Sequence, residues 1–215
     1  DALDDALVAT GFAYDRDEHP NYETFVRVAK VARDRGMGRE VDPRWSKSLS
    51  SFGSRLRWHG HFMQRLEDEP AMEFENLNRA FDGLRENHWD EERFVAWREG
   101  RTGFPMVDAC MRSLAATGWL NFRMRAMLVS FAAHDLWLHW RRPGLHLARC
   151  FVDFEPGIHF SQLQMQAGTT GINQLRIYNP AKQQREHDPE GHFVRFWVPE
   201  LRGVPTEPLA EPWRM

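Results

Sequence analysis

The amino-acid sequence predicts an all-α fold, and three observations support that prediction. No run of residues alternates between apolar and polar side chains for long, as a half-buried strand would. Apolar residues recur instead at steps of four and three from Trp45 to Leu66, which is the spacing of one helical face. Proline and glycine divide the apolar segments that follow, and no internal repeat or low-complexity tract is present.

The first hundred residues are predicted to contain three helices. Asn21 is a suitable N-cap, and the long apolar stripe predicts a helix of about six turns. The expected elements are, in order, a helix from Asn21 to Gly36, a loop over residues 36–43, a helix from Pro43 to Leu66, and a short helix at Asp90–Arg98 within an acidic, irregular segment.

The remaining residues carry stronger start and stop signals. Proline is tolerated in the first turn of a helix, and glycine commonly follows the last turn. The expected elements are, in order, a helix from Pro105 to Thr117, a long apolar helix over residues 117–140 that is stopped by Pro143-Gly144, a short helix to about Phe151, a long loop through Gly171, and a last helix at Gly191–Trp197 before a proline-rich tail.

The composition excludes a generally basic nucleic-acid-binding protein. The net charge is −3 and the pI is about 6.4, so any contact with DNA must come from a local cationic patch. Nine tryptophans and 15 phenylalanines indicate a thick core, and they also suit a planar ligand or electron hopping. Cys110 and Cys150 are expected to be inert thiols in a reducing compartment. The longest apolar stretch, residues 126–133, is too short to span a membrane, so the sequence predicts a cytoplasmic protein without a membrane segment.

Two arginines stand near the start of the long apolar helix and point in nearly opposite directions. Arg123 and Arg125 are separated by two steps of about 100°. A buried guanidinium without a partner costs several kcal/mol, so at least one of them must be paired. The best acidic candidates are Asp153 and Glu155, which flank Phe154 in an apolar segment. A purely structural salt bridge and a ligand-contacting pair are both compatible with this pattern.

Other familiar chemistries do not fit the sequence. There are ten histidines, but none has the spacing of a metal site, so no metal is expected. The GxSxG motif of the α/β-hydrolases is missing, as are GxGxxG and the P-loop. A nucleotide cofactor would therefore bind outside the Rossmann and Walker schemes.

Several long motifs, in the right order, resemble the DNA photolyase/cryptochrome family. They are "EGRTGFPMVDACMRSLAATGWLNFRMRAMLVSF", "RIYNPAKQ", "DPEGHFVRFWVPELRGVP" and "EPW". The resemblance runs from about Trp45 to Trp213 and covers the family's helical FAD-binding domain, so it implies FAD as the cofactor. Residues 45–215 are expected to form that domain, and residues 1–44 an N-terminal helical segment left from the upstream part.

The resemblance also implies what lies outside these motifs. The family's α/β antenna domain has no counterpart here, and neither has the Thr-Ser-Arg-Leu-Ser loop that grips the FAD phosphates. The chain begins with Asp1 and is expected to be a fragment or a processed product, with the antenna domain supplied by the missing N-terminal part.

The resemblance assigns roles to individual positions. Trp119, Arg123 and Arg125 match the family's helix beside the flavin, and Asp153 matches the aspartate that pairs with the second arginine. The other cofactor, electron-transfer and substrate positions that it implies are Glu155 on the polar edge of the isoalloxazine, His159 facing flavin N5, Trp140 in the electron-transfer chain, Trp58 in the lesion cavity, and Arg176, Asn179, Pro180 and Gln183 closing that cavity near DNA.

Four positions depart from the family pattern. Arg55 stands where a glutamate contacts the lesion, and Phe122 replaces an asparagine near flavin and substrate. Met165 replaces the second cavity tryptophan, and Leu163 the innermost tryptophan of the electron-transfer chain. We expect Trp140 to relay electrons toward Trp137 or Tyr178 instead.

The resemblance favours an enzyme, a deoxyribodipyrimidine photolyase-type lyase that repairs pyrimidine photoproducts in damaged duplex DNA with light and reduced FAD. A cationic rim for that DNA would come from Arg55, Arg141, Arg142, Arg149 and Arg176. The alternatives are a cryptochrome-like light receptor that signals through a partner, and a degenerate helical domain without flavin. Because Arg55 is a donor where the family has an acceptor, we expect salt-sensitive DNA binding with little preference for damage.

Overall fold

The computed structural model describes residues 46–172 and 176–215, and the elements of those residues are helices, with no strand among them. The predicted all-α class is confirmed. Two compact units, residues 1–65 and 66–215, are described separately. The predicted helix from Asn21 to Gly36, the loop over residues 36–43 and the boundary at residue 44 lie outside the described residues, so they stay predictions.

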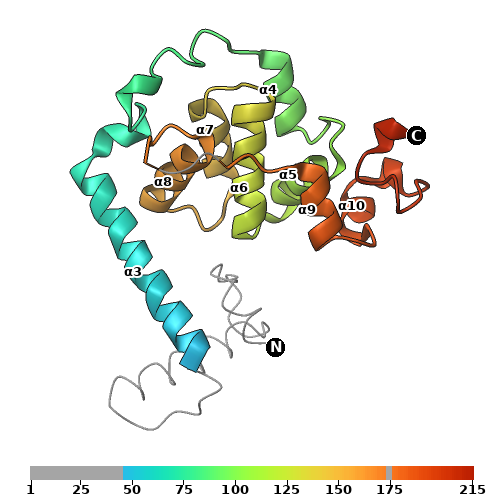
Figure 1. The fold of residues 1–215 in the computed structure, drawn as a ribbon, viewed down its shortest axis with the longest axis horizontal. Helices are drawn as coiled ribbons and strands as arrows, with labels where there is room; N and C mark the ends of the chain where they lie inside the picture. Colours follow the sequence, from blue (N-terminus) through green and yellow to red (C-terminus); the bar gives the residue numbers. More distant parts are fainter. Residues whose placement is uncertain (1–45, 173–175) are drawn as a thin grey trace. The chain divides into compact units, whose positions relative to one another are not determined.

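Helix α3 (Ser46–Asp68) is the helix expected from the apolar stripe (Figure 1). In the first unit, three aromatic rings of this helix lie about one turn apart and contact one another. The ring of Trp58 lies 5.6 Å from those of His61 and Phe62, and Phe62 is buried. These side chains are three and four residues apart, so they lie on the same side of the helix.

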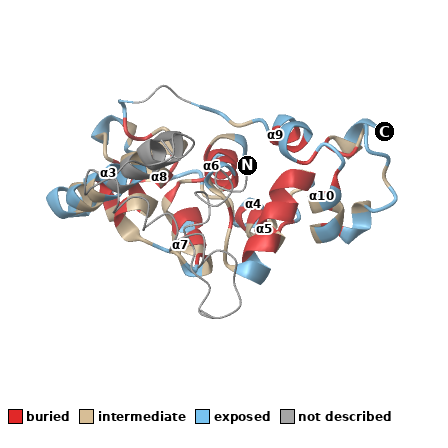
Figure 2. Cartoon of the chain, turned by 90° about the horizontal axis from the view of Figure 1, so that it is seen from below, coloured by how far each residue is buried: buried red, intermediate tan, exposed pale blue. Residues whose placement is uncertain are grey.

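The second unit is built around α5 (Pro105–Thr117), whose residues are mostly buried (Figure 2). The predicted bounds are confirmed: Pro105 occupies the first turn, and Gly118 ends the helix with a φ of 72°. Asp108 holds the preceding loop, because its carboxylate accepts hydrogen bonds from Thr102 and from the backbone of Gly103.

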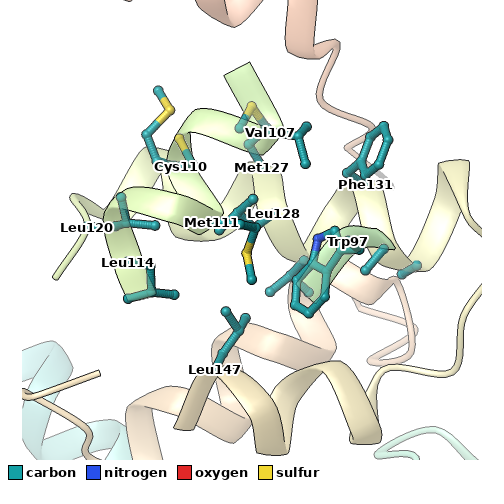
Figure 3. Close-up of a cluster of buried hydrophobic side chains, with 14 of the residues drawn as sticks. Trp97, Val107, Cys110, Met111, Leu114, Leu120, Met127, Leu128, Phe131 and Leu147 are labelled. Atoms are coloured by element: carbon teal, nitrogen blue, oxygen red, sulfur yellow. The ribbon is translucent and has the colours of Figure 1, made fainter. Parts of the chain in front are cut away.

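Four helices pack against α5. They are α4 (Glu91–Arg98), α6 (Phe122–Ser130), α9 (Pro180–His187) and α10 (His192–Trp197). Figure 3 shows Trp97 of α4, Met111 and Leu114 of α5, and Leu128 of α6 gathered in one cluster. The predicted helices at residues 90–98 and 191–197 are thereby confirmed.

The predicted helix over residues 117–140 is wrong in its extent. Helix α6 begins only at Phe122, continues as one wide turn, η4 (Phe131–Asp135), and then stops. The stop has a local cause: Trp137 has a φ of 57°, and the N–H of Leu138 returns to the carbonyl of Ala132. A left-handed residue with such a return bond ends a helix even where glycine is missing.

The expectation that Pro143-Gly144 stops a helix is also wrong. Both residues lie in the first turn of α7 (Arg141–Cys150), where the missing N–H of proline is not needed. Gly144 is required for packing, since a Cβ there would lie 2.2 Å from a methyl carbon of Leu163.

The predicted long loop through Gly171 is wrong as well, because it contains α8 (Pro156–Ala167). Glu155 caps this helix, and Gly168 ends it with a φ of 75°. Apolar periodicity does not predict this helix, because one of its buried positions is a glutamine. Gln164 donates to the carbonyls of Met72 and Glu75, and it accepts from Leu77 and Thr169, so α8 is tied to η2 (Pro70–Glu73).

The C-terminal residues form short turns around α9 and α10. Asp188 accepts from the backbone N–H groups of Phe193 and Val194, which caps α10. Three short helical turns complete the described elements, namely η3 (Arg79–Phe81), η5 (Pro199–Leu201) and η6 (Pro212–Arg214). No helix in the described part of the chain combines the length and the apolar character needed to cross a membrane.

Candidate functional site

The site is built around an ion pair between α6 and the segment before α8. Nη2 of Arg125 lies 2.8 Å from Oδ2 of Asp153, so the pair that the sequence predicts is formed. Nε of Arg125 donates to the carbonyl of Leu120, and the guanidinium lies 4.0 Å from the centre of the Phe151 ring. Both charged side chains are mostly shielded from water, with exposed fractions of 25% and 17%.

The second oxygen of Asp153 has no partner. Oδ1 is buried and accepts no hydrogen bond within the described chain. A buried carboxylate oxygen without a donor is costly, and native proteins usually supply one from protein, water or ligand. The arrangement therefore leaves an acceptor that suits an N–H group of a bound molecule.

Arg123, the other arginine near the start of α6, is not part of this ion pair. Arg123 is exposed, and its neighbour Phe122 has an exposed fraction of 57%. Trp119, before α6, is half-buried, and the side chain of Asn121 caps α6 by accepting from the N–H of Met124. One guanidinium is thus paired inside the fold while the other is available at its surface, which resolves their opposed directions.

Glu155, the N-cap of α8, and His159, in the first turns of α8, lie near the Arg125–Asp153 ion pair. The two carboxylate oxygens of Glu155 accept from the N–H groups of Gly157 and Ile158, so only their remaining lone pairs are available to a ligand. The imidazole Nε2 of His159 lies 2.9 Å from the carbonyl oxygen of Gly144 and therefore carries its proton there. Burial, helped by the nearby charge of Arg125, lowers the pKa of His159, which keeps the ring neutral.

Two of the positions that depart from the family pattern, Leu163 and Met165, lie on α8. Leu163 is buried against Gly144, which leaves no room there for a larger ring without movement of α7. Met165 is half-buried on the same helix.

Burial raises the pKa of Cys110 to about 12, in agreement with an inert thiol.

Trp140 is buried at an exposed fraction of 1%. Its indole Nε1 donates to Oδ1 of Asn76 over 2.7 Å, and the ring packed beside it is that of His139, at 5.3 Å. Within the described residues Trp140 makes no ring contact with Trp137 or Tyr178, the relay partners expected from the sequence. Sequence reasoning missed Asn76, because no local pattern connects two residues 64 positions apart.

The expected DNA-contacting residues differ in exposure. Arg55 and Trp58 are exposed on α3, in the first unit, and Arg176 is exposed in the second. Gln183 is buried instead, and its Oε1 has no partner within the described chain.

Besides Arg176, three of the expected rim arginines lie in the second unit, and they differ in their partners. Arg141 donates to the carbonyl of Glu73, and Arg142 pairs with Glu91 and lies over the ring of Trp89. Arg149 is exposed, and no acidic partner lies near it in the described part of the chain.

Comparison with known proteins identifies the family. The sequence model of the family described as the FAD binding domain of DNA photolyase matches residues 52–215. The chain belongs to the DNA photolyase/cryptochrome family. This photolyase-family chain spans only part of its relatives, about a quarter to two fifths of their length.

Three relatives show the range of the family. A deoxyribodipyrimidine photo-lyase of Alkalihalophilus pseudofirmus is 33% identical over 174 residues, which are 79% of this chain and 36% of that protein. A cryptochrome DASH of Gloeobacter violaceus is 39% identical over 127 residues, 59% of this chain and 25% of that one. The crystal structure of a class III photolyase from Agrobacterium tumefaciens is 27% identical with a TM-score of 0.74, covering 91% of this chain and 39% of that one.

The residues present fit the cofactor of this photolyase-family domain, which is FAD. The unpartnered oxygen of Asp153 needs a donor, and the flavin ring offers N–H groups and carbonyl oxygens on one edge. The exposed aromatic ring of Phe122 and the exposed side chain of Arg123 lie at the start of the same helix.

Proposed function

We propose that this chain is the FAD-binding part of a photolyase-type lyase that repairs pyrimidine photoproducts in DNA. The observation that carries the proposal is the Arg125–Asp153 pair, whose second carboxylate oxygen is buried and accepts no hydrogen bond from the described residues. A purely structural salt bridge would have no reason to keep that oxygen unsatisfied, because its burial costs free energy. The names of the relatives, photo-lyase and cryptochrome, agree with a light-dependent flavoprotein.

Asp153 would accept an N–H of the flavin through Oδ1 while Arg125 holds the carboxylate in place. Arg125 is itself fixed by the carbonyl of Leu120 and by the Phe151 ring, so the acceptor is pre-oriented before any ligand arrives. Trp119, Arg123, Glu155 and His159 would complete the contacts to FAD. Reduced FAD, when bound, supplies the electron that light transfers to the lesion.

DNA would be bound by local charge, because the chain as a whole carries −3. The exposed arginines Arg55 in the first unit and Arg149 and Arg176 in the second would contact phosphates, which makes binding fall steeply with salt. Trp58, exposed on α3, offers a stacking face for a base.

The test is to measure flavin binding and repair with the same chain. The purified protein, incubated with FAD and freed of excess, should show a protein-bound flavin spectrum, and Asp153→Ala should lose it. Under blue light with a reductant, the loaded protein should restore a duplex containing a pyrimidine dimer. A chain that binds no flavin would refute the proposal altogether.

A second function is supported by the substituted positions. Leu163 fills the space beside Gly144, and the exposed Phe122 stands where the family has an asparagine. These changes favour a cryptochrome-like light receptor that signals through a partner. Flavin that is bound and reduced by light, without any repair of the duplex, would select this function over the lyase.

A further inference from the structure

The single N–H of the Trp140 indole donates to a residue that cannot take its proton. The indole N–H points at the amide oxygen of Asn76 over 2.7 Å, and both side chains are buried, with exposed fractions of 1% and 5%. An amide oxygen accepts hydrogen bonds well but is a very weak base. Bulk water does not reach the indole nitrogen, because the side chain is almost completely enclosed.

The orientation of the Asn76 amide follows from its partners. Its nitrogen donates to Oδ1 of Asp82 over 2.9 Å and to Oε1 of Glu86 over 3.2 Å. Ionised carboxylates only accept hydrogen bonds, and an indole only donates, so a flipped amide would break all three contacts. Backbone hydrogen bonds outweigh the partial burial of Glu86 and lower its pKa, so this carboxylate is ionised.

The histidine beside Trp140 is not a base for the indole proton either. Nδ1 of His139 accepts from the backbone N–H of Arg141, and Nε2 faces Glu86 at 3.6 Å. Its ring is tilted against the indole, with centres 5.3 Å apart and an angle of 34° between the planes, and the indole N–H points at Asn76 instead. The carboxylates of Asp82 and Glu86 are hydrogen-bonded to Asn76, so Asn76 lies between them and the indole N–H of Trp140.

We propose that Asn76 is a positioning residue that keeps the indole proton on Trp140 when this tryptophan loses one electron. One electron leaves the indole π system, no bond breaks, and oxidised Trp140 is a radical cation that returns to its starting state when the electron returns. The positive charge left on the indole is offset by the negative charges of Asp82 and Glu86, which polarise the Asn76 amide toward the indole. In the chain itself the electron would pass to the photoexcited flavin, so this role rests on the proposed function.

A charge-conserving swap tests the proposal. Asn76→Asp combined with Asp82→Asn keeps the net charge and keeps a hydrogen bond between the two positions, but it places a carboxylate against the indole N–H. On oxidation the proton should then move from the indole nitrogen to the new carboxylate, which leaves a neutral indolyl radical. The single variant Asp82→Asn, which retains the amide at residue 76, is the matched control and should keep the radical cation.

The measurement needs no flavin. Ultraviolet photoionisation of the chain in frozen solution, with an electron scavenger, oxidises tryptophans directly, and subtraction of the Trp140→Phe signal isolates Trp140. We expect the wild-type difference signal to show the N–H proton coupling of a radical cation by electron–nuclear double resonance, and the swap to lose that coupling. A neutral radical in the wild type, or the same species in wild type and swap, would overturn the proposal.

Two features keep this test decisive. If the swap variant does not fold, the wild-type signal alone decides, because the N–H coupling is either present or missing. The result is also independent of the proposed function, since photoionisation proceeds whether or not the chain binds FAD or repairs DNA.

Discussion

Nη2 of Arg125 donates to Oδ2 of Asp153 over 2.8 Å, although the two residues are 28 positions apart in the sequence. The first lies on α6 and the second just before α8, and these two helices pack against each other. The pair therefore links the helix that carries the exposed Arg123 to the segment that carries the unsatisfied carboxylate oxygen.

Removing Asp153 should destabilise the protein. Asp153→Ala leaves the guanidinium of Arg125 without its counter-charge, and breaking a buried pair in this way costs roughly 3–5 kcal/mol. We expect the lower end, because a quarter of the Arg125 side chain is exposed. Urea unfolding measures the change. Glu99→Gln, which breaks an exposed pair with Arg101, should leave the midpoint unchanged, and equal midpoints for wild type and Asp153→Ala would contradict the expectation.

Replacing Gln164 should also destabilise the protein. Gln164→Leu removes the side-chain partner of the buried carbonyl of Met72 and of the partly buried carbonyl of Glu75 and N–H of Leu77. An unsatisfied buried group costs about 1–3 kcal/mol, so a loss of about 1–3 kcal/mol of unfolding free energy is expected. Gln162→Leu, two residues earlier on α8, is the control. A similar small loss in both variants would show that the hydrogen bonds of Gln164 contribute little.

Acid should destabilise the fold through its histidines. Burial is the largest cause that lowers the pKa of four imidazoles in the native state, namely His134, His139, His146 and His159. The unfolded chain then binds more protons than the native one as the pH falls through about 6.5, so the stability present above that pH is progressively lost.

Urea unfolding at several pH values between 7.5 and 5.5 checks this prediction. Burial raises the pKa of Asp108 and Asp135, which act in the opposite direction, but carboxyl groups titrate mainly at lower pH. His88→Gln, at an exposed position, should leave the slope unchanged, while His159→Asn should reduce it. A stability that is independent of pH over this window would refute the prediction.

Trp140→Phe should markedly slow the reduction of bound flavin by light in the presence of an external reductant. A buried indole is easier to oxidise than a phenyl ring, so its removal takes away the proposed relay. Trp137→Phe should have a small effect, because Trp137 makes no ring contact with Trp140 in the described part of the chain. Absorption during illumination follows the reaction, and equal rates for wild type and Trp140→Phe would exclude this route.

Binding to DNA should be electrostatic and show little preference for damage. Arg55 presents donors, which favour phosphates and carbonyl edges, and it is exposed on α3. Raising the salt concentration should weaken binding to damaged and undamaged duplexes alike, and Arg55→Ala should reduce the salt slope by about one phosphate contact. Strong, salt-insensitive selectivity for a pyrimidine dimer would contradict this view of Arg55.

The sequence by itself determined the features whose causes are local. Pro105 and Gly118 bound α5 because a proline needs no N–H in a first turn and glycine adopts a positive φ without strain. The step of three and four residues predicted α3. The need to pair a buried guanidinium left Asp153 and Glu155 open as partners, and the family resemblance selected Asp153 for Arg125.

Only the tertiary structure decided the features whose causes lie far apart in the chain. Gln164 and Asn76 are polar, and they are buried because their partners come from segments 64 to 92 positions away. The end of the long apolar helix at Asp135 has a local cause, the left-handed Trp137, but no residue pattern signals that conformation, so it too was visible only in the structure. Hydrophobic periodicity reports which side chains avoid water, but it does not report which polar groups find partners inside, and here those partners place both α8 and Trp140.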